Sequence, residues 1–515
     1  MTICGASITW PPLARAAGIH STAEPGGAAA YTRGMNLVRS DVPFRLDRLP
    51  WSRWHWAVVI GLGITWVLDG LEVTIVSSVG ARLEDRSTLG LSADDVGLAA
   101  TSYLLGAVLG ALGFGVATDR YGRKRLFLIT LSLYIAATIA TAFSWNLGSL
   151  AVFRFLTGMG IGGEYSAINS TIDELIPARN RGWTDLAING TWWLGTMVGS
   201  AASLVLLDPH LVNQQFGWRL AFGMGAVLGL AVLLLRSTLP ESPRWLLTHD
   251  RPEEAARVVT EIEVSVARTH EVPASDGRTI EIDRDHRTTF LDVLRTMVTE
   301  YSSRTVLALS LMISQAFLYN AIFFTQSLAL RQFFAVRPQD VGLYAFPFAI
   351  GNLLGPLVLG RLFDRIGRRA MIGATYLGSG VALGVVAFLF HAHAFDARSI
   401  TIGFSIVFFM ASAGASAAYL TASEIFPIEA RAFAIAIVYA VGTLVGGAAA
   451  PWIFGKLIAS GSVDRLTLGY AFGAAMMVAG GIVALAIGVD AEGKSLEEIA
   501  APRSAAKQAP AASSG

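Results

Sequence analysis

The sequence predicts an all-α membrane protein whose twelve membrane-spanning helices form two pseudo-symmetric six-helix halves. Three observations support this fold class. Only 15% of the 515 residues are charged, whereas soluble globular chains carry about 25%. Twelve apolar segments are long enough for a helix to cross a bilayer. A charged sequence pattern occurs twice, each time between two such segments.

The apolar segments follow from the hydropathy of the chain. They cover residues 54–79, 94–117, 125–144, 148–171, 184–206, 218–238, 304–330, 340–362, 370–391, 399–422, 431–459 and 468–489. A polar stretch between the sixth and seventh segments separates the two halves. The expected parts of the chain are a disordered N-terminal extension (1–50), a first half (51–239), a central loop (240–303), a second half (304–490) and a tail (491–515).

Two short segments of the central loop, 252–259 and 290–295, have the pattern of amphipathic helices. They could lie on the membrane surface or be ordinary solvated helices. Residues 1–34 lack a signal-peptide pattern, and Met35 precedes a normal-looking start. We therefore expect Met35 to be the true start, or residues 1–34 to be a disordered tail. The residues from 501 onward have a disordered composition.

The repeated pattern reads G-x-x-x-D-R-x-G-R, at 115–123 and again at 360–368. A second pattern, E-x-x-P-x-x-x-R, occurs at 174–181 and at 424–431. Repeats of this kind predict two halves of similar structure. The glycines permit close contact between helices. The aspartates end a helix, where each can meet arginines or the N-terminus of a neighbouring helix.

Basic residues predict the orientation of the chain. The loop at 118–125 has four basic residues against Asp119, and the loop at 361–369 has four against Asp364. Loops on the other side are short and nearly balanced in charge. Because positively charged loops stay inside the cell, both termini are expected in the cytoplasm.

Four ionisable residues lie inside predicted spans: Asp69 and Glu72 in the first, and Arg154 and Glu164 in the fourth. An ionisable group within a membrane is costly and is a functional candidate by default. Asp69 and Glu72 are three residues apart and share one face of a helix. We expect these four to couple transport to protons, and the sequence does not choose between the two acids. Alternatively, the charges only neutralise one another.

The repeated pattern resembles the loop signature of the major facilitator superfamily of membrane transporters. The runs at 154–162, 240–246 and 492–499 resemble those of its sugar porters, and Asp-Gly-Leu-Glu at 69–72 resembles its aromatic-acid:proton symporters. The resemblance implies a cavity between the halves, lined by spans one, four, five, seven, eight, ten and eleven. It also implies a cytoplasmic latch between the halves. The implied latch residues are Gly115, Asp119, Arg120, Gly122, Arg123, Glu174, Arg181, Gly360, Asp364, Arg365, Arg368, Glu424 and Arg431.

The seventh span contains Gln315 and Asn320 within a run that resembles one of the sugar porters. With Asn189 and Tyr419, these residues are the implied substrate contacts, because amides both donate and accept hydrogen bonds. Trp192 and Trp193 could supply an aromatic wall or simply pack. Ser314 replaces a glutamine of the sugar-porter run, and residues 411–420 lack the proline and tryptophan of that family. These departures weigh against a hexose.

We therefore expect a secondary transporter of a small polar organic solute, namely a sugar, a polyol or an organic or aromatic acid, by proton symport. An uncoupled facilitator and a drug or metabolite exporter are the alternatives. No phosphate-binding loop for ATP occurs. An enzyme would need a nucleophile with a base, or metal ligands, and no span carries paired His or Cys. A nutrient receptor on a transporter scaffold would need a large signalling tail, and the tail of this chain is short.

The expected partners follow from this function. They are the lipid bilayer, the solute and protons, and the chain is expected to act as a monomer in the cell membrane. We expect no cofactor and no catalytic or metal-binding residue. The single cysteine, Cys4, excludes an intrachain disulfide. A net charge of +1 gives no reason to expect nucleic acid.

Overall fold

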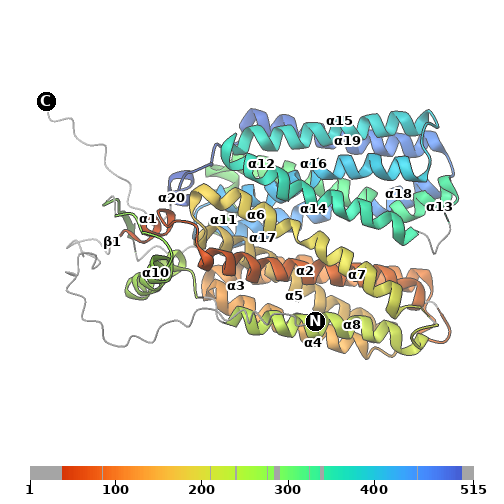
Figure 1. Ribbon diagram of the computed structural model, residues 1–515, viewed down its shortest axis with the longest axis horizontal. Coiled ribbons are helices and arrows are strands. Elements are labelled where there is room, and N and C mark those ends of the chain that lie inside the picture. The colour runs from red at the N-terminus through yellow and green to blue at the C-terminus, as the bar shows by residue number, and fades with distance from the viewer. Residues whose placement is uncertain are drawn as a thin grey trace.

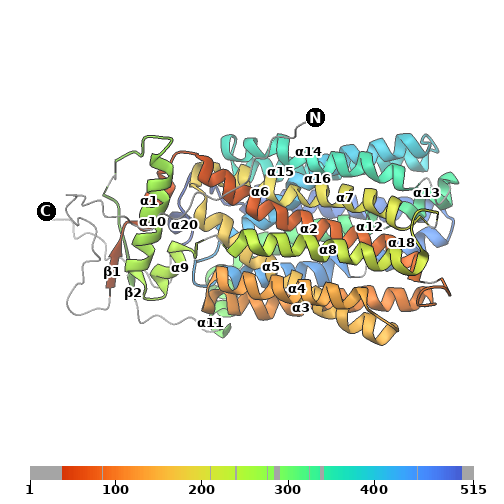
Figure 2. The same ribbon diagram turned by 60° about the horizontal axis from the view of Figure 1, so that its bottom comes forward.

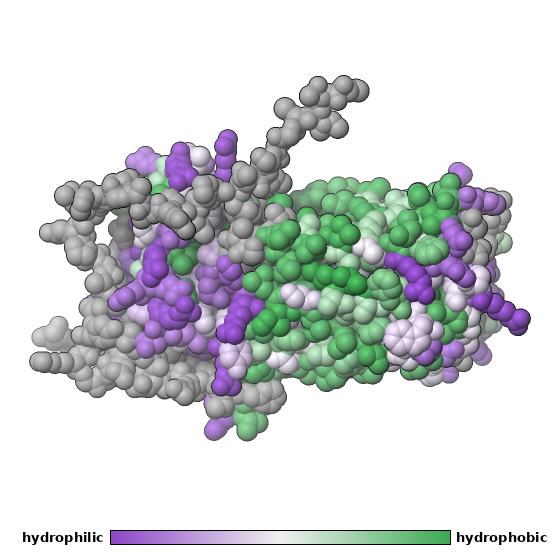
Figure 3. All heavy atoms as spheres, turned by 90° about the horizontal axis from the view of Figure 1, so that it is seen from below, coloured by the Kyte–Doolittle hydropathy of each residue, from purple (hydrophilic) through white to green (hydrophobic). Residues whose placement is uncertain are grey.

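The computed structural model describes residues 37–501, apart from residues 84, 209, 238–239, 275–276, 284–289, 324, 337–340 and 449. The expectations for residues 1–34 and for the end of the tail lie outside this part. The described chain forms a long bundle of helices (Figure 1). On the face seen in Figure 3, apolar side chains form a broad band over the helices, with polar side chains toward the two ends.

Each half of the chain forms one side of the bundle, with α3, α4 and α8 at the bottom of Figure 1 and α15 and α19 at the top. The helices of the first half are α2 (Arg53–Leu83), α3 (Ala93–Tyr121), α4 (Arg123–Ala142), α5 (Leu147–Leu175), α6 (Arg181–Gly190), α7 (Trp192–Leu206) and α8 (Gln214–Ser237). Those of the second half are α12 (Ser302–Ile322), α13 (Gln326–Phe334), α14 (Val341–Arg365), α15 (Arg368–His391), α16 (Ala397–Glu424), α17 (Arg431–Gly442), the π-helical turn η4 (Thr443–Gly447), α18 (Ala450–Ala459) and α19 (Val463–Ile487).

The predicted spans are confirmed as helices. Ten stretches of the described chain, with α17, η4 and α18 counted together, are long and apolar enough to cross a membrane. The fourth predicted span is α5, whose buried charges make it less apolar. The fifth is divided into α6 and α7 at Thr191, whose hydroxyl donates to the carbonyl oxygens of Gly63 and Ile188 at 2.8 and 2.6 Å. The seventh is divided in the same way into α12 and α13.

Glycines bring α3 and α5 into backbone contact, as the sequence predicts. A β-carbon on Gly158 would overlap the carbonyl oxygen of Tyr103, and one on Gly162 would overlap that of Ala107. Such contacts between small residues are a main source of helix association in membranes. They fix the position of α5, which carries Arg154 and Glu164.

The elements outside the two halves gather at one end of the bundle, on the left of Figures 1 and 2. They are β1 (Leu37–Ser40), α1 (Val42–Asp47), α9 (Pro243–Thr248), α10 (Pro252–Ala267), β2 (Ile280–Asp283), α11 (Phe290–Arg295), η2 (Thr296–Glu300) and α20 (Leu496–Ile499). The short turn η1 (Ala178–Asn180) belongs to the first half and connects α5 to α6. Strands β1 and β2 pair antiparallel, with Leu37 opposite Asp283. We call this end the motif end, because the two repeated charged patterns also lie there.

One expectation about this end needs correction, and one alternative that the sequence left open is decided. Residues 37–47 were expected to be disordered, but they form β1 and α1. Arg45 and Arg48 of α1 bond to Glu263 of α10, at 2.6 and 2.7 Å. The apolar face of α10 packs on α1 and α9, and Val259 on that face is fully buried. This amphipathic helix therefore covers protein and not lipid.

Candidate functional site

Two aspartates of the repeated pattern join the halves at the motif end. The backbone N–H of Phe433 donates to Asp119 Oδ2 at 2.9 Å, and that of Ala432 to Oδ1 at 3.3 Å. In the same way, Asp364 accepts from the backbone of Trp183 at 2.7 Å and of Gly182 at 3.0 Å. The donors belong to the first turns of α17 and α6, whose N–H groups have no partner within the helix. Each aspartate thus caps a helix of the opposite half, where the helix dipole favours a negative charge.

Arginines of the same pattern hold these aspartates in place. Arg123 lies 3.3 Å from Asp119 and 2.9 Å from Glu174. Glu174 in turn lies 3.7 Å from Arg431 of the other half.

The second copy of the pattern repeats this arrangement. Arg368 lies 2.8 Å from Asp364 and 3.1 Å from Glu424, and Glu424 lies 3.7 Å from Arg181 of the first half. Two similar charge networks therefore cross the boundary between the halves.

The pattern's glycines have separate structural roles. A β-carbon on Gly115 would lie 2.6 Å from the β-carbon of Ala436 in α17, so a side chain there would force the halves apart. A β-carbon on Gly360 would have more room, since it would lie 3.3 Å from Cδ1 of Trp183. Gly122 and Gly367 adopt φ angles of +100° and +118°. These conformations favour glycine and turn the chain sharply between two helices.

Arg120 and Arg365 do not join this network. Both side chains are exposed, and in the described part of the chain neither forms an ion pair with a latch carboxylate. Arg120 instead lies over the ring of Tyr121. In each copy, the arginine beside the aspartate faces water, whereas the arginine four residues after the aspartate turns inward.

Sequence reasoning missed a second set of contacts at the motif end. Glu241 accepts from the backbone of Arg123 at 2.9 Å, and Glu492 accepts from that of Arg368 at 3.1 Å. Arg244 pairs with Asp47 at 2.9 Å and with Glu497 at 3.2 Å. Burial raises the pKa of the Glu241 carboxyl, although backbone N–H groups work against this. The sequence runs at 240–246 and 492–499 could have indicated these contacts, because they contain Glu241 and Glu492, which bond to the two copies of the charged pattern.

We predict that Asp119→Asn weakens closure of the motif end without preventing folding. Asparagine keeps the size of the side chain but removes the charge that caps α17. Such a charge is worth up to about 2 kcal/mol in a partly buried site, which corresponds to roughly a 30-fold shift between closed and open states. A cysteine placed at the buried Ile428, in a Cys4→Ser background, should react faster with a water-soluble alkylating reagent.

Asp396→Asn is the matched control, because Asp396 also caps a helix N-terminus, that of its own helix α16, at an exposed position away from the motif end. Transport by Asp119→Asn should be slower at a normal protein level. Unchanged transport together with unchanged alkylation would show that Asp119 does not act as a latch.

Asp69 lies at the centre of the bundle. Tyr165 donates to its Oδ2 at 2.5 Å, and Trp192 Nε1 donates to the same oxygen at 2.9 Å. Its Oδ1 is buried and has no hydrogen-bond partner within the described residues. A small space of about 10 Å³ adjoins it, lined also by Glu164 and Thr65. A space of this size, lined by polar groups, is just large enough for one water molecule.

Glu72 has different neighbours. Its carboxylate lies 2.6 Å from the guanidinium of Arg154, and Tyr134 donates to it at 3.5 Å. The guanidinium also lies 4.4 Å from the centre of the Tyr103 ring. The side chains of Glu72 and Arg154 are only 0% and 3% exposed. The two acids therefore have different environments. Glu72 is buried in an ion pair between helices of the first half, whereas Asp69 faces the centre of the bundle.

Four aromatic rings from both halves meet beside Asp69. Tyr165 lies 4.9 Å from Trp66, 4.7 Å from Tyr439 and 6.1 Å from Tyr419, measured between ring centroids. These four residues, from α2, α5, α16 and α17, are called the central ring cluster. The separations are those of favourable aromatic pairs.

A second cluster of rings continues the interface between the halves. Trp193 lies 5.9 Å from Tyr319 and 5.1 Å from Phe323, and Phe348 lies 4.5 Å from Phe408. Within the described residues, rings of the two halves therefore touch in the region where the central cavity was expected. The space beside Asp69 is much smaller than a solute.

Only one of the four implied substrate contacts lies beside Asp69. Tyr419 belongs to the central ring cluster. Gln315 Nε2 lies 2.9 Å from Met312 Sδ, and Asn320 Nδ2 donates to the carbonyl of Ala316 at 2.7 Å. Asn189 Nδ2 donates to Asp185 Oδ2 at 3.1 Å. The NH2 groups of the three amides thus bond to their own helices, as polar side chains in helices often do, whereas Asn189 Oδ1 is buried and has no hydrogen-bond partner within the described residues.

The chain is similar to known membrane transporters. The family described as "Sugar (and other) transporter" matches residues 54–502. The niacin transporter NiaP of Acinetobacter baylyi is 27% identical over 462 residues, which is 89% of this chain and 99% of that protein. The 4-hydroxybenzoate transporter PcaK of Pseudomonas aeruginosa is 28% identical over 353 residues, which is 67% of this chain and 74% of that protein.

A solved structure has the same fold. The proton:xylose symporter XylE, a member of the major facilitator superfamily, superposes on this chain with a TM-score of 0.69 at 19% identity. The superposition covers 86% of this chain and 98% of XylE.

Proposed function

Since the chain belongs to the sugar (and other) transporter family of the major facilitator superfamily, we propose that it is a proton-coupled transporter of small aromatic solutes. The family and the similar proteins are transporters and not enzymes. The chain is a multi-pass membrane protein. In this proposal it lies in the cell membrane with both termini in the cytoplasm, because the basic loops lie at the motif end.

The observation that carries the proposal is the central ring cluster beside Asp69. Trp66 and Tyr165 come from one half, and Tyr419 and Tyr439 from the other. When the halves separate at either end, these ring contacts are lost. A flat aromatic solute can replace them, because it stacks on the rings of both halves. The NH2 groups of the amides that would suit a sugar are bonded to their own helices.

The charges at the centre restrict the solute further. Asp69 and Glu164 both border the small space described above. No arginine or lysine of the described chain lies over a ring of the central cluster, and Arg154 is paired with Glu72. A carboxylate solute would therefore meet like charge at low dielectric, which is unfavourable. Protonation of Asp69 removes one of these charges, so an aromatic acid should bind together with a proton.

The relatives support an aromatic solute, because niacin and 4-hydroxybenzoate are both single rings that carry a carboxylate. In the proposed cycle, Asp69 takes up a proton when the centre is open to one side. The solute then binds, the halves rock to the closed state seen here, and the latch opens toward the other side.

A thermal-stability screen tests the solute class. We expect nicotinamide and benzamide to stabilise the purified protein at pH 8, by about 2.7 kcal/mol at 100 times the dissociation constant. Nicotinate and benzoate should do so mainly at pH 5. Tyr419→Leu should weaken binding about 3- to 10-fold, as expected for one aromatic contact. Tyr121→Leu, at an exposed tyrosine, is the control. Stabilisation by xylose or inositol and by no aromatic compound would contradict the proposal.

A further inference from the structure

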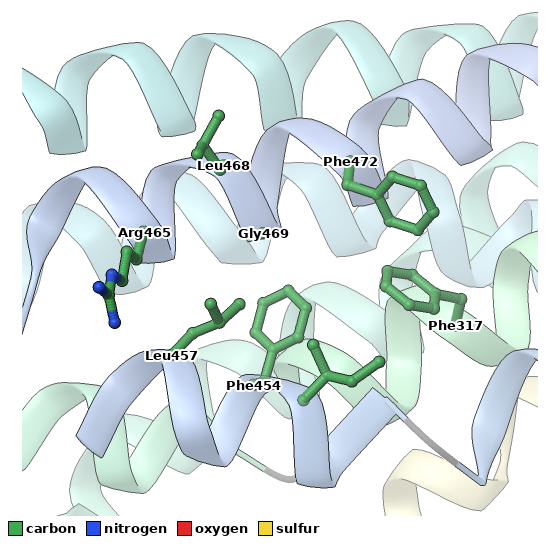
Figure 4. A pocket seen from close by; sticks show the side chains of 8 residues that line it. Phe317, Phe454, Leu457, Arg465, Leu468, Gly469 and Phe472 are labelled. Carbon is green, nitrogen blue, oxygen red and sulfur yellow. The ribbon is translucent and has the colours of Figure 1, made fainter. Parts of the chain in front are cut away.

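A groove on the side of the bundle has no role in the proposed transport cycle. It lies between α18 and α19, with α12 behind it, and has a volume of about 310 Å³. Phe317 and Phe472 lie toward one end and Arg465 lies at the other, with Phe454 and Leu457 between them (Figure 4). Its size is at the lower end of the range for ligand sites in proteins.

The groove opens toward the membrane and not toward the centre of the bundle. Phe472 is 55% exposed and Leu468, on its rim, is 70% exposed, and both lie on a helix that crosses the membrane. Because hydrocarbon surrounds such a helix, the occupant of the groove has to be apolar along most of its length.

The groove depends on a glycine. A β-carbon on Gly469 would lie 2.8 Å from Leu457 Cδ1 and 3.1 Å from Phe454 Cζ. The absence of a side chain at this position leaves room for these two residues to pack against α19.

Arg465 gives the groove one charged end. It lies in the first turn of α19, and Phe472 is seven residues further along, which is about 10 Å along the helix axis. Within the described residues no acceptor contacts the Arg465 guanidinium, whereas the neighbouring Asp464 pairs with His391 at 3.1 Å. The positive N-terminus of α19 adds to the charge of Arg465. This end of α19 is the boundary between membrane and water, where lipid headgroups lie.

From this combination we propose that the groove binds a membrane phospholipid with an anionic headgroup. One acyl chain lies along Phe472 and Phe317, and the headgroup phosphate accepts hydrogen bonds from Arg465. Arginine suits this role because its planar group binds phosphate oxygens in pairs. The proposal concerns lipid and is independent of the transported solute.

Thermal unfolding of the delipidated, detergent-purified full chain tests the site, with phosphatidylglycerol and phosphatidylcholine of identical acyl chains as probes. We expect phosphatidylglycerol to raise the melting temperature at lower concentration than phosphatidylcholine. Arg465→Gln should weaken phosphatidylglycerol binding about tenfold and phosphatidylcholine binding much less, because the choline cation of phosphatidylcholine offsets the charge of its phosphate. Leu468→Trp, which fills the rim of the groove, should weaken binding of both lipids.

Arg398→Gln is the matched control, since Arg398 is an exposed arginine near the start of α16 and does not line the groove. Equal stabilisation by the two lipids in the unmodified protein would overturn the choice of an anionic headgroup. Equal effects of Arg465→Gln and Arg398→Gln, or an unchanged response in Leu468→Trp, would overturn the site itself.

Discussion

Replacing Asp69 with asparagine is expected to abolish accumulation of solute against its gradient while exchange of solute across the membrane persists. Asparagine can still accept the hydrogen bonds from Tyr165 and Trp192 through its amide oxygen. It resembles the protonated acid in size and charge, but it cannot release a proton. One proton moving down a gradient of one pH unit supplies about 1.4 kcal/mol, or roughly tenfold accumulation, and the variant should lose all of it.

The measurement compares two assays on the same proteoliposomes. In the first, a pH gradient drives net uptake, and in the second, labelled solute exchanges with unlabelled solute at equal pH. We expect Asp69→Asn to fail only the first. Asp464→Asn, on the exposed surface, should pass both. Normal uphill uptake by Asp69→Asn would show that Asp69 does not carry the proton.

Replacing Glu72 with glutamine is expected to lower the stability of the folded protein, in addition to any effect on the coupling of transport to protons. The change leaves the Arg154 guanidinium buried without a countercharge, since Glu72 is its ion-pair partner at 2.6 Å. Removing one member of a buried ion pair typically costs about 3–5 kcal/mol. We expect a much lower yield of monodisperse protein and a lower melting temperature, both measured after size-exclusion chromatography.

The double variant Glu72→Gln/Arg154→Met tests this explanation, because it removes both charges. Replacing both members of a buried pair with uncharged residues is often neutral, so yield should recover. If Glu72→Gln is instead stable but unable to drive uphill uptake, then Glu72 is the proton carrier and the roles given to the two acids are reversed.

The spans could be predicted because they depend on local sequence, and the equivalence of the two aspartates at the motif end could be predicted because the pattern is repeated. A membrane helix needs an apolar run of a certain length, and such a run is visible in one sequence. The charged pattern occurs twice, so Asp119 and Asp364 could be expected to play equivalent parts. The repeated pattern alone does not show which of its arginines point to water. Arg120 and Arg365 do so because each is next to an aspartate, and neighbouring residues on a helix differ in direction by about 100°.

The centre of the protein was harder to predict. Asp69 and Glu72 share a broad helix face, but three residues leave about 60° between them. Because of this difference in direction, Asp69 faces the centre of the bundle and Glu72 faces Arg154. The central ring cluster joins Trp66 and Tyr439, which are far apart in sequence, and no local pattern connects them. The pairing of β1 with β2 was missed for the same reason.

Uptake of radiolabelled nicotinate into proteoliposomes, with and without an imposed pH gradient, tests the central claim most directly. With the inside alkaline by one pH unit, uptake should overshoot to roughly tenfold accumulation, and a proton ionophore should reduce it to equilibration. Unlabelled nicotinamide should compete with it, and xylose should not. Uptake of the same extent and rate with the gradient, without it, and in the presence of the ionophore would contradict proton coupling and show an uncoupled facilitator.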